Sequence, residues 1–435
     1  MAKKTKIEDK WEQLFERYDI IGRVEKNGIF EIAADEVREY KEPRLMAKFD
    51  HESKLPAIFR KNKLSILPIS RSKYVISNFS AYHFLEENES TLKHFSLPSH
   101  IESINRNSIN TETIALNAAL DSGILEDFLE DEDILPTVSG RMCTGAFNFK
   151  IDNSRSHSEN NVKVENAQME IDGAYEGRNA LSLVEAKLDI SDDFHIRQLY
   201  YPLRFWSTKN KKPVNTVFMI YSNGIYKFYD YEFTNIENYN SLQLKKYQEY
   251  TFDEVKISES DVRHIQTHVK IVEEPNITFP QADRFEKVIN LCEILSTQDL
   301  TANDIKDRYE FVNRQANYYA DAGRYLGLIE KCSDNPNSNS APLYTLTAKG
   351  KSIIEKDYAH RQLAFCEAIL SHEIFHTVFS EYLSSGSLPS NTRIIEIMRK
   401  AGVHGAASNS TMNRRRQTIT SWIRWIVSLY SDRKK

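Results

Sequence analysis

Apolar and polar positions alternate with a period of two through the middle of the chain, which is the pattern of β-strands. The runs 214–221 and 225–233 flank Asn223-Gly224, a dipeptide typical of tight hairpin turns. Helical spacing of apolar residues predicts one helix over residues 111–130 and another from 193 to about 206. The order helix, two strands, helix, two strands indicates an α+β core, with a mixed sheet flanked by helices, over residues 106–278.

The segments on either side of this core have other patterns. Residues 1–105 mix a helical start with short strand-like runs at 63–70 and 74–77. They are interpreted as an α/β accessory domain for DNA recognition or dimerisation. Residues 279–360 predict three helices followed by a two-stranded flap, which is the plan of a winged helix-turn-helix. Residues 361–435 are again helical and predict a second, winged-helix-like DNA-binding module.

Two carboxylates and an ammonium group occupy positions on neighbouring predicted strands. Asp172 lies on one strand, and Glu185 and Lys187 share a face of the next. A hairpin through residues 175–179 would bring all three side chains together. Glu170 shares the face of Asp172 and is either a further metal ligand or a solvated strand residue, whereas Glu112 fits a helix start.

Phosphodiester hydrolysis requires such a cluster. Two carboxylates, Asp172 and Glu185, can hold a hard cation such as Mg²⁺. The cation neutralises phosphate charge and activates a water molecule. Lys187 can stabilise the developing negative charge and orient or deprotonate that water.

This arrangement resembles the PD-(D/E)xK nuclease superfamily. The sequence around it is similar to that of one group of type II restriction endonucleases. The resemblance covers roughly residues 110–235, although Ile171, and not proline, precedes Asp172. The segments that carry it are Gly140-Arg141, Phe147-Asn148-Phe149, Met169-Glu170-Ile171-Asp172-Gly173, Glu185-Ala186-Lys187 and Arg197-Gln198-Leu199-Tyr200-Tyr201-Pro202.

The resemblance implies a Mg²⁺-dependent endonuclease that cuts double-stranded DNA at a specific site and leaves 5′-phosphates. It implies that Asp172 and Glu185 are metal ligands, that Lys187 is the catalytic lysine, and that Gln198 is a helper residue. It also implies a bacterial restriction–modification system with a cognate DNA methyltransferase. One active site cuts one strand, so a double-strand break indicates a homodimer or sequential nicking.

Two helix starts are predicted to contact DNA. Arginine can bond guanine, and asparagine or glutamine can bond adenine, through two points each. In the second set, contact with phosphates is favoured over base readout. The residues are Asn313, Arg314, Gln315 and Asn317 in the first helix, and Asn413, Arg414, Arg415 and Arg416 in the second.

Two other functions fit parts of the sequence. His372-Glu373-Ile374-Phe375-His376 matches HExxH, the zinc-peptidase signature, but the extended HxxGxxH form is absent, and Glu396 lacks the usual flanking pattern of a third ligand. The other alternative is a DNA-binding regulator with an inactive nuclease core, against which the intact Asp172, Glu185 and Lys187 argue.

The amino-acid composition excludes few of these possible functions. The net charge of −5 does not indicate nucleic-acid binding, but residues 361–435 hold eleven Lys and Arg against five Asp and Glu. The four cysteines are far apart and show no CxxC spacing, which disfavours a disulfide framework or a cysteine zinc site. No membrane span or secretory signal is expected, so a cytoplasmic protein is predicted.

Overall fold

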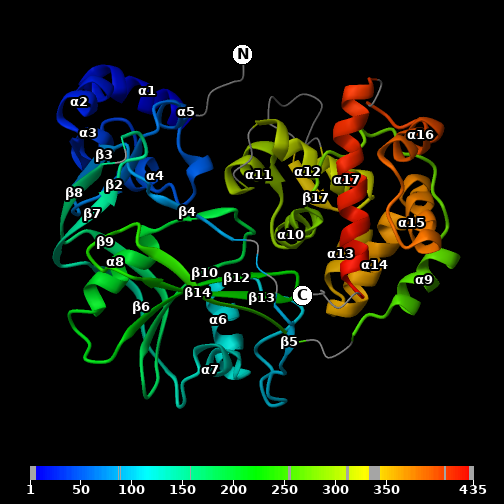
Figure 1. The fold of residues 1–435 in the computed structure, drawn as a ribbon, viewed down its shortest axis with the longest axis horizontal. Helices are drawn as coiled ribbons and strands as arrows, with labels where there is room; N and C mark the ends of the chain where they lie inside the picture. Colours follow the sequence, from blue (N-terminus) through cyan, green and yellow to red (C-terminus); the bar gives the residue numbers. More distant parts are fainter. Residues whose placement is uncertain are drawn as a thin grey trace.

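The computed structural model describes residues 6–86, 88, 90–156, 158–252, 256–309, 313–332, 343–405 and 408–430. It is an α+β protein built around a mixed sheet, with a smaller domain and a helical region packed beside it (Figure 1). The N-terminal domain and the sheet lie on one side of the molecule, and the C-terminal helices on the other (Figure 1).

Within the described residues, the central sheet has seven strands in the order β5-β14-β13-β12-β10-β9-β6. The pairs β10–β12 and β14–β5 are parallel, and the other neighbours are antiparallel. The strands are β5 (Lys93–His94), β6 (Leu135–Cys143), β9 (Gln168–Glu176), β10 (Leu181–Lys187), β12 (Val214–Ser222), β13 (Ile225–Phe233) and β14 (Leu242–Thr251). The predicted mixed sheet is therefore present.

Helices cover both faces of this sheet (Figure 1). Helices α6 (Glu112–Asp121) and α7 (Ile124–Leu129) pack on one face, and α8 (Arg197–Trp206) packs on the other. The single helix predicted over 111–130 is divided at Gly123, whose φ of 82° is left-handed. The second predicted helix begins later than expected, at Arg197, because Asp193–His195 forms strand β11 and pairs with β4 (Tyr82–Phe84).

The hairpin between β12 and β13 confirms the Asn-Gly turn. Asn223 and Gly224 have φ values of 55° and 72°, and two consecutive positive φ values are the requirement of a type I′ turn. Glycine adopts this conformation without steric cost, and asparagine tolerates it better than most residues. The dipeptide therefore determines where the two strands reverse.

The N-terminal domain has its own hydrophobic core around Trp11, Phe15 and Phe59, whose rings pack edge to face. Its sheet has the order β1-β3-β2. A separate ribbon, β7 with β8, packs beside it. The elements are α1 (Lys6–Tyr18), α2 (Ile20–Asn27), β1 (Phe30–Ala33), α3 (Ala34–Arg38), α4 (Pro43–Ala47), η1 (Glu52–Lys54), α5 (Ala57–Lys61), β2 (Ser65–Pro68), β3 (Lys73–Ser77), β7 (Ala146–Asp152) and β8 (Glu159–Glu165).

The C-terminal region shares one hydrophobic core that extends from Ile257 to Ile426, so residues on both sides of position 360 contribute to it. The three helices and the two strands expected in 279–360 are present, and β15, β17 and β16 form a small sheet. The elements are α9 (Glu259–His268), α10 (Phe285–Leu295), β15 (Leu300–Thr301), α11 (Ala302–Tyr309), α12 (Asn313–Tyr325), β16 (Ile329–Cys332), β17 (Leu343–Leu346), α13 (Ala348–Ile354), α14 (Tyr358–Leu370), α15 (Glu373–Ser385), α16 (Asn391–Ala401) and α17 (Asn409–Ser428).

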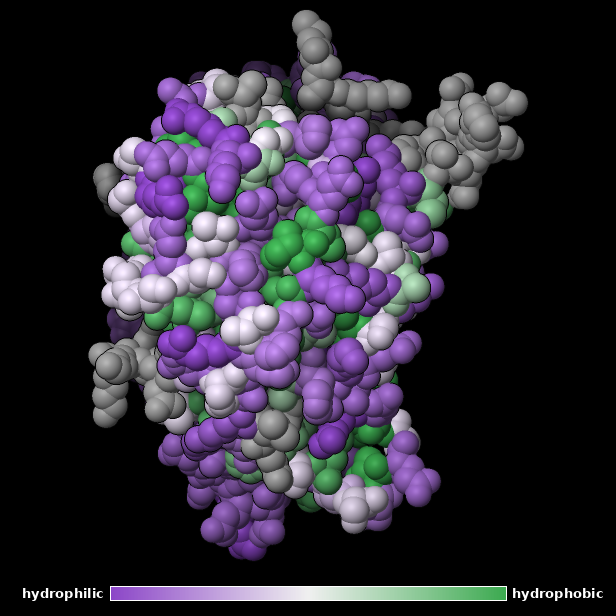
Figure 2. Space-filling view, turned by 90° about the vertical axis from the view of Figure 1, so that its right-hand side faces the viewer, coloured by the Kyte–Doolittle hydropathy of each residue, from purple (hydrophilic) through white to green (hydrophobic). Residues whose placement is uncertain are grey.

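The second predicted module, over residues 361–435, corresponds mainly to helices α14 to α17. In residues 361–405 and 408–430, which the structure describes, there are helices but no strand, and hence no two-stranded wing. The apolar residues of these helices are used in the shared core instead. Their outer face is mainly hydrophilic, with small scattered hydrophobic groups (Figure 2). Within the described chain, no helix has the length and apolar character that crossing a membrane requires.

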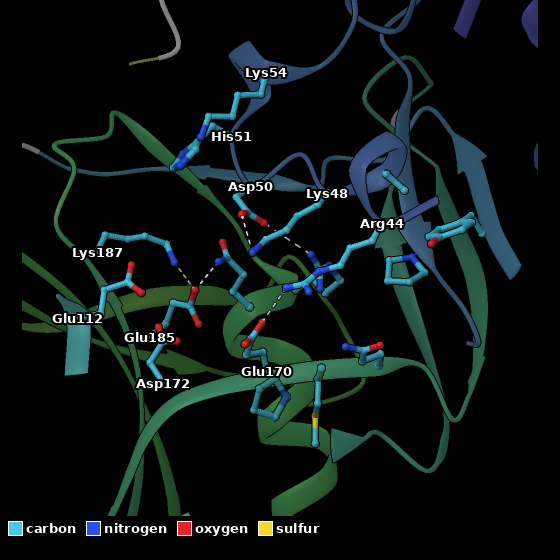
Figure 3. Close-up of a pocket in the computed structure, with 18 of the residues that line it drawn as sticks. Arg44, Lys48, Asp50, His51, Lys54, Glu112, Glu170, Asp172, Glu185 and Lys187 are labelled. Atoms are coloured by element: carbon cyan, nitrogen blue, oxygen red, sulfur yellow. Dashed lines mark hydrogen bonds and ion pairs between the residues drawn. The ribbon is translucent and has the colours of Figure 1, made fainter. Parts of the chain in front are cut away.

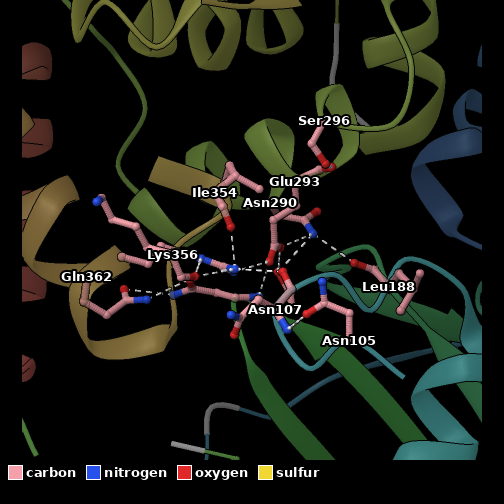
Figure 4. Close-up of polar contacts among 12 residues, drawn as sticks. Asn105, Asn107, Leu188, Asn290, Glu293, Ser296, Ile354, Lys356 and Gln362 are labelled. Carbon is pink, nitrogen blue, oxygen red and sulfur yellow. Dashed lines mark hydrogen bonds and ion pairs between the residues drawn. The ribbon is translucent and has the colours of Figure 1, made fainter. Parts of the chain in front are cut away.

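A buried polar network joins the central sheet to the C-terminal region (Figure 4). The carboxylate of Glu293 on α10 accepts hydrogen bonds from Ser222 Oγ and from the backbone N–H of Asn223, both at 2.8 Å. Arg361 Nη1 lies 3.3 Å from the same carboxylate, and the Arg361 side chain is 5% exposed. The side-chain amides of Asn223 and Gln362 bond each other at 2.8 and 3.0 Å. The hairpin turn is thus held by helices α10 and α14.

Replacing Glu293 with alanine is expected to lower the free energy of unfolding by about 2–3 kcal/mol, because it removes one partner of a buried charge and leaves two donors without an acceptor. Urea denaturation followed by tryptophan fluorescence measures this loss. Glu367→Ala, at an exposed position of α14, is the control and should change stability by less than about 0.5 kcal/mol. Equal effects of the two substitutions would contradict the assignment.

Candidate active site

The strands β9 and β10 separate at the point where the predicted acidic residues lie. Their antiparallel ladder ends with the pair Val184–Gly173. The next pair in that register would be Glu185 with Asp172. Instead, the Asp172 carboxylate accepts a hydrogen bond of 2.9 Å from the backbone N–H of Ala186. An oxygen of Asp172 thus takes the place of a backbone carbonyl of β9 as the hydrogen-bond acceptor. The diverging strands leave room for a site between them.

Glu185 is the centre of the contacts in this opening. Lys187 Nζ lies 2.5 Å from Glu185 Oε1, and the side-chain amide of Gln198, in the first turn of α8, donates to the same oxygen. Val184 and Ala186 belong to the core under α6 and α7, so Glu185 and Lys187 point to the opposite face, where α8 packs. The structure therefore brings Asp172, Glu185, Lys187 and Gln198 together.

The alternation predicted for β9 is confirmed by burial. Met169 and Ile171 are each 3% exposed, whereas Glu170 is exposed and Asp172 is partly buried. The Glu170 carboxylate lies 3.4 Å from Arg44 and 3.3 Å from Arg141. It therefore takes part in a surface ion pair, which favours the solvated alternative for this residue.

The charges of the site shift the pKa values of its members. Burial raises the pKa of Glu185 to about 7, opposed by Lys187 and assisted by Asp172. Burial alone would lower the pKa of Lys187, but the carboxylates of Glu185, Asp172 and Glu112 outweigh it and raise that pKa. Burial also raises the pKa of Glu112, which lines the same cavity. Lys187 is therefore a fixed cation, whereas Glu185 can gain or lose a proton near neutral pH.

The carboxylate oxygens of this site suit a hard divalent cation that takes only a few of its ligands from the protein. Mg²⁺ commonly takes one or two protein carboxylates and keeps several waters, and Asp172 and Glu185 supply two. Gln198 Oε1 is buried and has no hydrogen-bond partner within the part of the chain that the structure describes, so it can accept from a bound water. Among the described residues, no group of three or more His, Cys, Asp or Glu side chains forms a ready-made metal cluster.

The N-terminal domain lines the same cavity, which the sequence did not predict (Figure 3). The cavity has a volume of about 440 Å³ and lies between the diverging strands and residues 44–74. Asp50 is the acidic residue of this part, and the nearby cations Lys48, Arg197 and Lys187 overcome its burial and lower its pKa to about 2. No local motif marks Asp50, because only folding brings it to the strands.

The residues predicted to contact DNA differ in their exposure and contacts. The backbone of Asn313, Arg314, Gln315 and Asn317 begins helix α12, but these side chains lie outside the described residues. On helix α17, Asn413 and Arg414 are exposed, and Arg416 is partly buried and bonds Asn391 at 2.5 Å.

Arg415 is the exception on helix α17. Its side chain is 7% exposed and donates to the backbone carbonyl of His404 at 3.0 Å. It therefore points into the protein, and its predicted role in DNA contact does not fit this placement.

The HExxH segment does not have the geometry of a zinc site. Helix α15 begins at Glu373, so His372 precedes it as the N-cap residue. The His372 ring is 3% exposed and stacks on Tyr325, with ring centroids 4.2 Å apart. His376 Nε2 is bonded to the backbone carbonyl of Gln266 at 2.9 Å. The two rings thus have structural contacts in a helical core.

Comparison with known proteins finds three matching family models, and each describes a domain of unknown function. No curated protein and no solved structure matches the chain. The models are DUF6996 at residues 8–76, DUF6997 at residues 77–251 and DUF7226 at residues 287–431. The chain is therefore similar to three families in succession, and the second contains Asp172, Glu185, Lys187 and Gln198.

Proposed function

We propose that this protein is a Mg²⁺-dependent DNA endonuclease of the PD-(D/E)xK type, and specifically a type II restriction enzyme. The observation that carries the proposal is the convergence of Asp172, Glu185 and Lys187 in one cavity where β9 and β10 diverge. Helix α6, strands β9 and β10, helix α8 and strands β12 and β13 follow one another along the chain, with other elements between them, in the order that the sequence pattern predicts. The helices and flap of 279–360 would act as a winged helix on double-stranded DNA.

Each residue of the site has a separate task in this proposal. Mg²⁺, held by Asp172 and Glu185, would neutralise phosphate charge and lower the pKa of a water. The ammonium of Lys187 would stabilise the negative charge that develops on the phosphate. Gln198 fixes the orientation of Glu185, and the Ala186 N–H fixes that of Asp172. Such contacts hold catalytic groups in place before the substrate binds.

The biological setting follows from the proposed class of enzyme. A restriction endonuclease requires a DNA methyltransferase of the same specificity to protect the host DNA. Because one centre of this kind cuts one strand, a double-strand break requires a homodimer or two successive nicks. A palindromic target would favour the dimer, since the symmetry of the site then matches that of the protein.

Incubation of the purified protein with phage and plasmid DNA in Mg²⁺ tests the proposal. Discrete fragments that EDTA abolishes are expected, and sequencing of the fragment ends gives the target. A smear would indicate a nuclease without sequence specificity. Intact DNA in both Mg²⁺ and Mn²⁺, together with tight DNA binding, would favour the regulator with an inactive core.

The pKa of Glu185 makes cation binding depend on pH. With a pKa of about 7, this carboxyl is mostly protonated at pH 6, and a cation must displace the proton. We expect the Mg²⁺ affinity to rise roughly tenfold between pH 6 and pH 8, with proton release at the lower pH. Titration calorimetry in buffers of different ionisation enthalpy measures both quantities, and a pH-independent affinity would contradict the assignment.

The same pKa affects the stability of the protein without metal. Because burial favours the protonated form of Glu185, its contribution to stability is present below its ordinary pKa and is lost as the pH rises through about 7. Glu185→Gln should remove both this pH dependence and the proton release. If Glu185→Gln still releases a proton when Mg²⁺ binds, as the wild type does, the proton comes from another group.

A further inference from the structure

Four cationic side chains of the N-terminal domain line the cavity of the proposed active site. They come from residues 44–71, and Arg44, Lys48 and Lys54 lie across the cavity from Asp172 and Glu185 (Figure 3). We call this set the cationic wall, and it consists of Arg44, Lys48, Lys54 and Arg71.

The segment that carries most of this wall is fixed to the sheet domain by buried contacts. His51 Nδ1 lies 2.7 Å from the carbonyl oxygen and 3.1 Å from the carboxylate of Asp193, and both side chains are almost fully buried. The Asp193 carboxylate also accepts from the backbone N–H of Glu52 at 2.9 Å. The backbone N–H of His195 bonds the Asp50 carbonyl at 2.9 Å. The wall is therefore held at a fixed distance from the site.

Arg44 and Lys48 of the wall form long ion pairs, and their side chains remain about half exposed. Arg44 is 45% exposed and shares the carboxylate of Glu170, at 3.4 Å, with Arg141. Lys48 is 48% exposed, and its ammonium lies 3.6 Å from Asp50. The Arg44–Glu170 pair is exposed on both sides, and pairs of this kind stabilise a protein by less than about 1 kcal/mol. Lys48 faces the largely buried Asp50, and its half-exposed side chain still lines the cavity. These cations therefore remain able to attract an anion in the cavity.

The opposite wall explains why such cations are needed. It carries the carboxylates of Glu112, Glu170, Asp172, Glu185 and Asp189, together with the cations Lys187 and Arg197. Asp172, Glu185 and Glu112 act on the charge of Lys187. A carboxylate surface repels a polyphosphate, whereas fixed cations attract it and hold it in register. A strand that enters the cavity would thus have the acidic centre on one side and the cationic wall on the other.

We propose that the cationic wall binds the sugar–phosphate backbone of the DNA strand that enters the active site, so that the N-terminal domain forms half of the cleavage cleft. This inference rests on the proposed nuclease function and gives the N-terminal domain a role in it. The contacts are to phosphates, so they position the strand and carry no sequence information directly.

The test compares two double variants. Arg44→Ala/Lys48→Ala removes two charges of the wall. Lys26→Ala/Lys61→Ala removes two exposed charges of the same domain that do not line the cavity. Binding of a fluorescent duplex in EDTA is measured at several salt concentrations, and cleavage is measured in Mg²⁺. The wall variant should bind about tenfold more weakly, with a salt slope lower by about 1–2, and the control should match the wild type.

The outcomes separate this inference from the proposed function. An unchanged salt slope in the wall variant overturns the cationic wall, whether or not the wild type cuts DNA. A lowered slope together with a wild type that cuts no DNA in Mg²⁺ or Mn²⁺ supports the wall and overturns the nuclease. Arg44→Lys/Lys48→Arg retains both charges and should restore binding, which separates charge from packing. Lys48→Gln, at a half-exposed position, replaces the double variant if that variant fails to fold.

Discussion

Lys187→Ala is expected to reduce the rate of DNA cleavage by roughly 10³-fold, while DNA binding changes by less than about threefold. The ammonium of Lys187 is largely buried against Glu185, and four carboxylates, those of Glu185, Asp172, Glu112 and Asp50, raise its pKa. In the proposed reaction Lys187 would stabilise charge in the transition state, and its largely buried position limits its share in the attraction of DNA. Single-turnover cleavage and a binding titration in EDTA measure the two effects separately.

The chain contains a matched control for this substitution. Lys163 and Glu165 on β8 form an ion pair of 2.5 Å with the same two-residue spacing, but both side chains are more than half exposed. Lys163→Ala should leave cleavage unchanged, since an exposed strand pair of this kind contributes little. Cleavage by Lys187→Ala at a rate within about fivefold of the wild type would overturn the assigned role of Lys187.

Asp172→Asn is expected to abolish detectable cleavage and to weaken Mg²⁺ binding by at least about tenfold. The substitution keeps the size of the side chain and an oxygen that can accept from the Ala186 N–H, but it removes the negative charge. It should also lower the pKa of Glu185, because the Asp172 charge helps to raise that pKa. Calorimetric titration with Mg²⁺ therefore gives a readout that is independent of activity.

Glu170→Gln is the comparison for this experiment. Glu170 lies two residues earlier on the same strand, is exposed, and pairs with Arg44 and Arg141. We expect it to retain cation affinity and most of the cleavage rate. Loss of Mg²⁺ binding in Glu170→Gln would instead make this residue a metal ligand, and normal binding in Asp172→Asn would remove Asp172 from that role.

Local patterns in the sequence predicted most strands of the central sheet and the helices that cover it. Alternation over 214–221 and 225–233, with Asn223-Gly224 between them, predicted β12, β13 and their turn, because side-chain period and positive φ are properties of a few neighbouring residues. The same periodicity placed Asp172 on one strand and Glu185 with Lys187 on the next. Their convergence could be predicted because a short hairpin leaves few ways to pair the two strands.

Tertiary packing decided the features that the sequence did not predict. Residues 193–195 form a strand, not a helical turn, because β4 supplies their hydrogen-bond partners. The run of three arginines at a helix start predicted that Arg415 contacts DNA, but the packing of α17 on the C-terminal core turns it inward. His372 and His376 match a zinc motif by spacing, but the surrounding core holds their rings in other contacts.

The residues that line the cavity show most clearly which features the sequence predicted and which only the tertiary structure decided. The sequence located the catalytic candidates on β9, β10 and α8, because they are close together along the chain. It could not locate Asp50 or the cationic wall, which are more than 100 residues away in the sequence and carry no motif. Their position depends on long-range contacts, chiefly those of His51 and Glu52 with Asp193. Long-range contacts of this kind follow from the packing of whole domains, which no local pattern encodes.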